Sequence, residues 1–73
     1  MFVKVCGLKT EAQIDQAIDL GYNAIGVVTY PKSKRFCSPE TAVRLAAYAG
    51  DRILRFVVGM TWNDVAAAAS AFD

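Results

Sequence analysis

Two kinds of chemically reactive side chain stand out in this sequence: a cysteine near its start and a group of basic residues further along. Cys6 ends a short apolar stretch and comes directly before Gly7. A cysteine acts as a base only as the thiolate, and since its ordinary pKa is about 8.5, nearby positive charge must favour that form. The basic group is Lys32, Lys34 and Arg35, of which Arg35 has a planar guanidinium that suits a carboxylate.

Each of these residues also has a plainer interpretation. Cys6 can be a small buried apolar residue. Three charges in four residues are most often a solvated loop, in which Lys32 and Lys34 would only help to attract an anionic ligand. We expect Cys37 and Trp62 to pack within the protein rather than to react or bind a ligand.

The elements that must position these side chains alternate between strand and helix. Short apolar runs rich in β-branched residues predict buried parallel strands, and apolar stripes of helical period predict the helices between them. The expected strands are residues 2–6, 24–28 and 53–59, and the expected helices are residues 11–20, 39–48 and 65–72. Cys6 then lies at the carboxyl end of a strand, where ligands bind in α/β proteins.

Local signals mark the helix starts and the loop between the second strand and second helix. Thr10 and Gln13 have the spacing of a capping box, and Ser38 followed by Pro39 is typical of a helix start. The connection at residues 29–37 is longer than the usual ~2–6 residues, which is typical of a functional loop. Gly26 weakens its strand and therefore indicates close packing or the approach of another group.

Composition limits the classes of function. The chain has 73 residues, 55% of them hydrophobic, and a formal net charge of +1, which argues against binding nucleic acid or a membrane surface through bulk charge. No apolar run approaches the ~20 residues of a membrane span, and we expect no signal peptide. Two cysteines without a CxxC pattern, and no histidine, predict reduced thiols, a cytoplasmic protein and no metal site. We also expect no cofactor.

The repeated strand-then-helix order predicts an α/β fold, with a βαβαβα parallel sheet and right-handed crossovers. Residues 3 to about 48, and above all the motifs Lys4–Leu8 and Tyr30–Glu40, resemble the amino-terminal part of phosphoribosylanthranilate isomerase. Members of that family are (β/α)8 TIM barrels. The resemblance therefore implies that residues 1–73 are a partial TIM-barrel segment with three βα units.

The resemblance implies an isomerase of tryptophan biosynthesis that performs the Amadori rearrangement of N-(5'-phosphoribosyl)anthranilate to 1-(2-carboxyphenylamino)-1-deoxyribulose 5-phosphate. Cys6 would be the general base, and Arg35 would contact the anthranilate carboxylate. Gly7 would permit a tight turn or backbone approach to this small-molecule phosphosugar substrate. The family's general acid and phosphate site follow later strands and match no residue here. Asp51, Asp64 and Asp73 do not correspond to that acid.

Two classes of function stay open for the 73 residues: an isomerase segment, and a non-catalytic βα fragment or assembly module that lacks the general acid and phosphate site. Nucleic-acid binding through residues 32–35 is a weaker third idea. We expect Val5, Ile25, Val27 and either Phe56 or Val57 to face away from the helices with nothing to cover them. The chain would then associate with itself or be complemented by a carboxyl-terminal segment.

Overall fold

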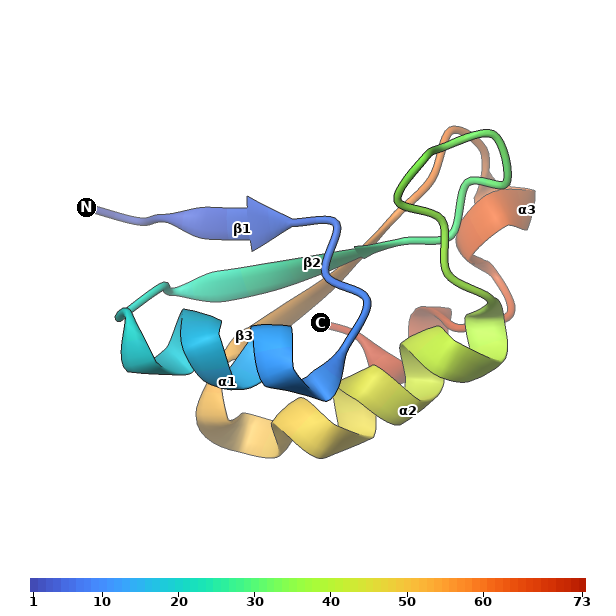
Figure 1. Ribbon diagram of the computed structural model, residues 1–73. Coiled ribbons are helices and arrows are strands. Elements are labelled where there is room, and N and C mark those ends of the chain that lie inside the picture. The colour runs from blue at the N-terminus through green and yellow to red at the C-terminus, as the bar shows by residue number, and fades with distance from the viewer.

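The computed structural model describes every residue from Met1 to Asp73 and has the expected alternation of strand and helix (Figure 1). No helix combines the length and the apolar character that crossing a bilayer requires. The elements in chain order are β1 (Lys4–Cys6), α1 (Glu11–Asp19), β2 (Ala24–Val28), α2 (Pro39–Ala49), a 3₁₀ turn (Gly50–Arg52), β3 (Leu54–Val58), α3 (Trp62–Val65) and a second 3₁₀ turn (Ala69–Ala71).

The three strands form one parallel sheet in the order β1-β2-β3. In its register Cys6 pairs with Gly26, and Gly26 pairs in turn with Phe56, so these residues form one row across the sheet. The expected parallel α/β fold is therefore confirmed. β1 and β3 are the edge strands.

The helix starts form as their capping residues predict. The Thr10 hydroxyl accepts a hydrogen bond from the Gln13 amide, and the Gln13 side chain accepts one from the Thr10 amide. Ser38 accepts from the Thr41 amide at 3.2 Å and begins α2 with Pro39 in its first turn. These contacts satisfy amide groups that a helix cannot satisfy internally, which explains why both boundaries were readable from the sequence.

Helices α1 and α2 cover one face of the sheet and form the core with it (Figure 1). Ile25 and Val27 of β2 are fully buried in this core, and Val5 packs against it. The expectation that these three residues face away from the helices is therefore wrong. Alternate residues of a strand face opposite sides of the sheet, and in a continuous apolar run both sets are apolar. The pattern therefore does not show which of the two sets the helices cover.

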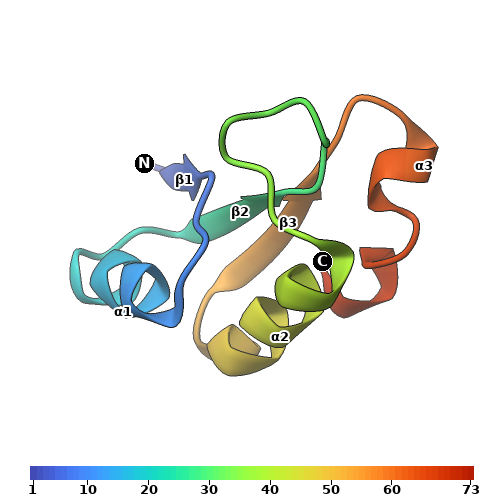
Figure 2. The same ribbon diagram turned by 45° about the vertical axis from the view of Figure 1, so that its right-hand side comes forward.

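Large side chains from the two long helices complete the core. Ile14 of α1 and Leu45 of α2 are completely buried, together with small alanines that let the helices approach the sheet. Burying a side chain of this size stabilises the fold by about 1.5–3 kcal/mol. The other face of the sheet, called the open face below, has no helix over it in either ribbon view (Figures 1 and 2). Its residues include Lys4, Cys6, Gly26, Leu54 and Phe56.

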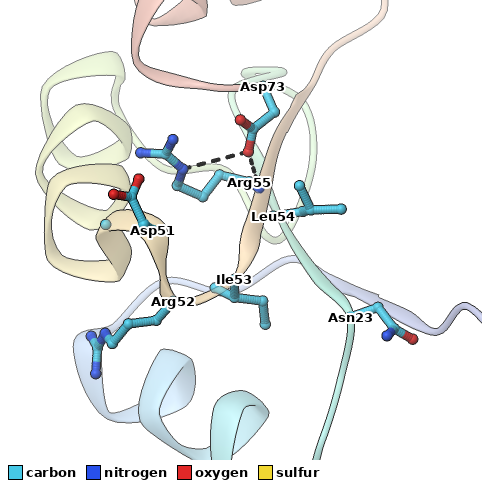
Figure 3. A pocket seen from close by; sticks show the side chains of 8 residues that line it. Asn23, Asp51, Arg52, Ile53, Leu54, Arg55 and Asp73 are labelled. Carbon is cyan, nitrogen blue, oxygen red and sulfur yellow. Dashed lines mark hydrogen bonds and ion pairs between the residues drawn. The ribbon is translucent and has the colours of Figure 1, made fainter.

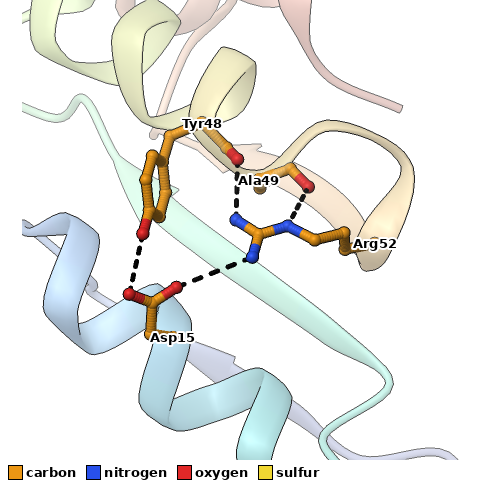
Figure 4. Close-up of polar contacts among 4 residues, drawn as sticks. All are labelled: Asp15, Tyr48, Ala49 and Arg52. Atoms are coloured by element: carbon orange, nitrogen blue, oxygen red, sulfur yellow. Dashed lines mark hydrogen bonds and ion pairs between the residues drawn. The ribbon is translucent and has the colours of Figure 1, made fainter.

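A polar cluster joins α1 to the end of α2 (Figure 4). The Tyr48 hydroxyl donates to Asp15 at 2.7 Å, and Arg52 lies 3.7 Å from the other oxygen of the same carboxylate. Arg52 also donates to the backbone oxygens of Tyr48 and Ala49. The hydrogen bond to Asp15 raises the pKa of Tyr48, because the carboxylate favours the protonated phenol. This cluster connects α1 with the end of α2 and lies on the helix side of the sheet.

The third βα unit departs from the expectation. The helix expected at residues 65–72 is wrong: α3 ends at Val65, and only the 3₁₀ turn Ala69–Ala71 follows. Ala68 is the one fully buried residue after β3. High alanine content favours a helix, but most helical stability comes from burying an apolar face, and alanines bury little. Trp62 does not pack as expected, since 69% of its surface is exposed.

Candidate active site

Cys6 lies at the carboxyl end of β1 on the open face, partly exposed to solvent. Its thiol lies against Gly26 of β2: a Cβ added at Gly26 would be only 2.8 Å from Cys6 Sγ. The contact that Gly26 indicated in the sequence is thus the cysteine itself. The amides of Gly7 and Leu8 both donate to the Gly26 carbonyl, at 2.9 and 3.2 Å, and hold the chain in place just after the thiol.

Gly7 turns the chain out of β1 with a φ of +83°, a conformation that side chains with a Cβ rarely adopt. The expected tight turn at Gly7 is therefore confirmed. A Cβ at this position would also collide with the Cδ atom of Arg35. The arginine side chain thus lies directly over the residue that follows Cys6. The structure brings together all three candidate site residues: Cys6, Gly7 and Arg35.

The loop at residues 29–37 carries Arg35 to this position, and it rises at the same end of the sheet as the turn after β3 (Figure 2). Internal hydrogen bonds order its middle: the Ser33 amide donates to the Tyr30 carbonyl, and the Ser33 hydroxyl accepts from the Arg35 amide at 3.1 Å. The buried Thr29 hydroxyl donates to the Asp64 carbonyl at 2.5 Å, which ties the loop's start to α3. The loop is therefore ordered by hydrogen bonds, although the side chains of Lys32, Lys34 and Arg35 are exposed to solvent.

The two cysteines have different environments. Cys37 closes the loop, where its amide donates to the Val28 carbonyl at 2.8 Å, and it is 5% exposed within the core. Burial raises the pKa of the Cys37 thiol, and the charge of Lys9 opposes this only in part. The expectation that Cys37 packs is confirmed. Of the two thiols, Cys6 is the one that faces the open side of the sheet.

Lys4 and Phe56 add a contact that the sequence analysis missed. Lys4 Nζ lies 4.9 Å from the centroid of the Phe56 ring, so the lysine of β1 reaches above β2 to the side chain of β3. Small residues at Ala24 and Gly26 leave room for this crossing. The available signal was the charge of Lys4 within an apolar strand, two residues before Cys6 and thus on the same face. The open face therefore combines a thiol, a cation and an aromatic ring.

A cavity of about 350 Å³ opens at the opposite end of the sheet, beside the start of β3 (Figure 3). The Arg55 amide donates to Asp73 at 2.6 Å, and the Arg55 Nε lies 3.5 Å from the same oxygen. The backbone hydrogen bond, helped by the guanidinium, lowers the pKa of Asp73. In parallel α/β barrels this end of the strands serves stability, whereas active sites occupy the carboxyl ends. Cys6, not this cavity, marks the candidate active site.

A parallel sheet with helices on one face, an open opposite face and reactive side chains at the carboxyl strand ends defines a segment of a (β/α)8 barrel. The comparisons with known proteins specify the family. No family model matches the sequence. The chain is 38% identical over 69 residues to an N-(5'-phosphoribosyl)anthranilate isomerase from Beijerinckia indica. The aligned residues cover 94% of this chain and 31% of that protein. The chain is 46% identical over 50 residues to the corresponding enzyme of Rhizobium meliloti, across 68% of this chain and 23% of that one.

Solved structures agree. TrpF from Jonesia denitrificans superimposes with a TM-score of 0.85 at 34% identity, over 97% of this chain and 36% of that one. Phosphoribosyl anthranilate isomerase from Thermus thermophilus gives a TM-score of 0.80 at 28% identity, over 93% and 37% of the two chains. The resemblance to the amino-terminal part of phosphoribosylanthranilate isomerase is confirmed. The chain spans about a third of the length of the first of these relatives.

Proposed function

We propose that residues 1–73 form three βα units of a phosphoribosylanthranilate isomerase and supply its general base, Cys6, and its carboxylate-binding residue, Arg35. The observation that carries the proposal is the position of Arg35 over Gly7, directly beside the cysteine at the end of β1. The similarity to isomerases over 94% of the chain supports it. One solved relative is described in complex with reduced 1-(o-carboxyphenylamino)-1-deoxyribulose 5-phosphate, a phosphosugar of the kind proposed as ligand here.

In the proposed reaction, an acid opens the ribose ring and leaves a Schiff base at C1′. The Cys6 thiolate takes the proton from C2′, and the electrons of the broken C–H bond form the C1′=C2′ bond of an enolamine, which neutralises the Schiff-base nitrogen. The enolamine then gains a proton at C1′ and loses the proton of its C2′ hydroxyl, giving the ketone. Arg35 would hold the carboxylate through two parallel N–H donors and so fix the substrate over the thiol.

The general acid and the phosphate site would come from later strands of a complete barrel. The proposed partners are therefore the phosphosugar substrate and the carboxyl-terminal segment that completes the sheet, with no role for nucleic acid, membrane, cofactor or metal. Cytoplasmic location stays a prediction; the presence of two free thiols fits it.

The test is a hybrid barrel in which residues 1–73 precede the rest of Jonesia denitrificans TrpF, assayed by the fluorescence of the substrate. Cys6→Ala should lower kcat by about 10²–10⁴-fold, the range for loss of a general base. Cys37→Ala is the matched control, since that thiol lies in the core, and it should keep kcat near that of the parent. A Cys6→Ala variant with parental kcat would contradict the proposal. A folded hybrid without any turnover would favour the non-catalytic module.

A further inference from the structure

Gly26 stands in the middle of a buried strand whose other positions are alanine, isoleucine or valine. A glycine inside a strand weakens it, because it adds backbone entropy to the unfolded chain and has no side chain to pack. Its backbone does not require glycine either: only Gly7, Gly21 and Gly50 have a positive φ. An alanine could adopt this conformation, so the reason for the glycine must lie in what a side chain would meet.

The atoms that a side chain would meet belong to Cys6. A Cβ at Gly26 would lie 2.8 Å from Cys6 Sγ, and 3.4 Å from both Cα and Cβ of the same residue. The first distance is too short for two atoms in contact, whereas the other two are ordinary contacts. The thiol itself therefore occupies the space that a methyl group would need.

The backbone around Cys6 is held in place, whereas its partly exposed side chain can rotate. β1 is paired with β2 at this position, and the Gly26 carbonyl holds the amides of the two residues that follow Cys6. In the same row, on the far side of Gly26, lies Phe56, with the Lys4 ammonium over its ring. An added methyl group would thus push the thiol, the most mobile of these groups, out of its present position.

We propose that Gly26 is a positioning residue: the absence of a side chain there creates the space in which the Cys6 thiol lies at the carboxyl end of β1. The consequence for catalysis rests on the proposed function, since a displacement of about 1 Å from the reacting position can cost ~10²-fold in rate. The steric contact itself is independent of catalysis and can be measured separately.

The first experiment is a double-mutant cycle on the thermal unfolding of the hybrid barrel. Gly26→Ala should lower the Tm by about 2–12 °C when Cys6 is present, as expected for overpacking in a protein of this size. In a Cys6→Ala background the same substitution should cost less than half as much. Gly59→Ala is the control: its Cβ would lie 2.6 Å from Asp64 Cβ and 2.9 Å from Val65 Cγ1, so its Tm loss should be equal in both backgrounds.

Equal losses for Gly26→Ala in both backgrounds would overturn the proposal, because the methyl group would then be colliding with the strand and not with the thiol. If Gly26→Ala does not fold with Cys6 but folds with Cys6→Ala, the proposal is supported. Failure to fold in both backgrounds overturns it.

The second experiment follows the thiol itself in a Cys37→Ala background. Gly26→Ala should change the rate at which iodoacetamide alkylates Cys6 several-fold at fixed pH, and Gly59→Ala should not. An unchanged alkylation rate contradicts the proposal. In the isomerase assay Gly26→Ala should lower kcat about 10²-fold with little change in KM. If the coupling is found but Cys6→Ala retains parental kcat, the proposed function fails while the positioning contact stands.

Discussion

The two faces of the sheet contrast in what their residues do. On the face covered by α1 and α2, Ile25 and Val27 are completely buried among helix side chains, and no titratable group of the sheet lies there except Arg55 at its edge. On the open face Lys4, Cys6 and Phe56 lie partly accessible around a glycine. The difference shows that one set of alternate residues in a strand can be buried in the core while the other set presents reactive side chains on the opposite face.

The contrast predicts first that the 73 residues produced alone will not catalyse the reaction and will associate. Both edge strands have unpaired backbone groups, and the open face exposes apolar side chains such as Leu54, which is 45% accessible. Light scattering and two-dimensional NMR at micromolar concentration, with the fluorescence assay alongside, measure this. A sharp monomeric spectrum together with turnover above background would show that the open face needs no cover.

Shortening a side chain on the covered face should lower the stability of the fold. Ile25→Ala removes a fully buried side chain and should lower the free energy of unfolding of the hybrid barrel by about 2–5 kcal/mol. Cys6→Ala, on the opposite face of the neighbouring strand, should cost much less stability although it removes the proposed base. Denaturant unfolding of both variants checks this. Equal losses of stability would remove the distinction between the two faces.

Substitution of Arg35 tests whether the substrate is bound through a specific contact. Arg35→Ala should weaken binding of substrate or of a product analogue by about 1.5–3 kcal/mol, the range for a hydrogen bond to a charged group. Lys34→Ala is the matched control, because it removes a neighbouring cation of the same loop, and it should matter much less. Calorimetric titration of the two variants measures the difference. Similar losses at both positions would indicate general attraction of an anion.

The smallest expected effect is a difference between the alkylation rates of the two thiols. Iodoacetamide at pH 8 should modify Cys6 before Cys37, because Cys37 is buried and burial raises its pKa. Raising the pH should speed the reaction of Cys37, since a larger fraction of that thiol is then ionised. Peptide mapping by mass spectrometry, with Cys6→Ala and Cys37→Ala as single-thiol references, follows each site. Faster labelling of Cys37 would reverse the assignment of the accessible thiol.

Much of the fold could be predicted because its signals are local. The capping pair Thr10 and Gln13 satisfies amides within one turn, and the β-branched run 24–28 forms β2 at the expected bounds. The resemblance of two motifs predicted which residues make up the candidate site, namely Cys6, Gly7 and Arg35. The Lys4–Phe56 contact was not predicted, since it joins strands 52 positions apart in sequence and depends on the register of the strand between them.

The sequence by itself determined the order of strands and helices, the starts of α1 and α2 and the resemblance to phosphoribosylanthranilate isomerase, because period, capping and motifs are properties of neighbouring residues. Only the tertiary structure decided which set of alternate residues in each strand faces the helices. That choice follows from the side on which the crossovers pack, and an apolar run does not encode it. The tertiary structure also decided that Arg35 lies over Gly7 and that the Cys6 thiol fills the space above Gly26, since both contacts arise only when separate βα units pair in register.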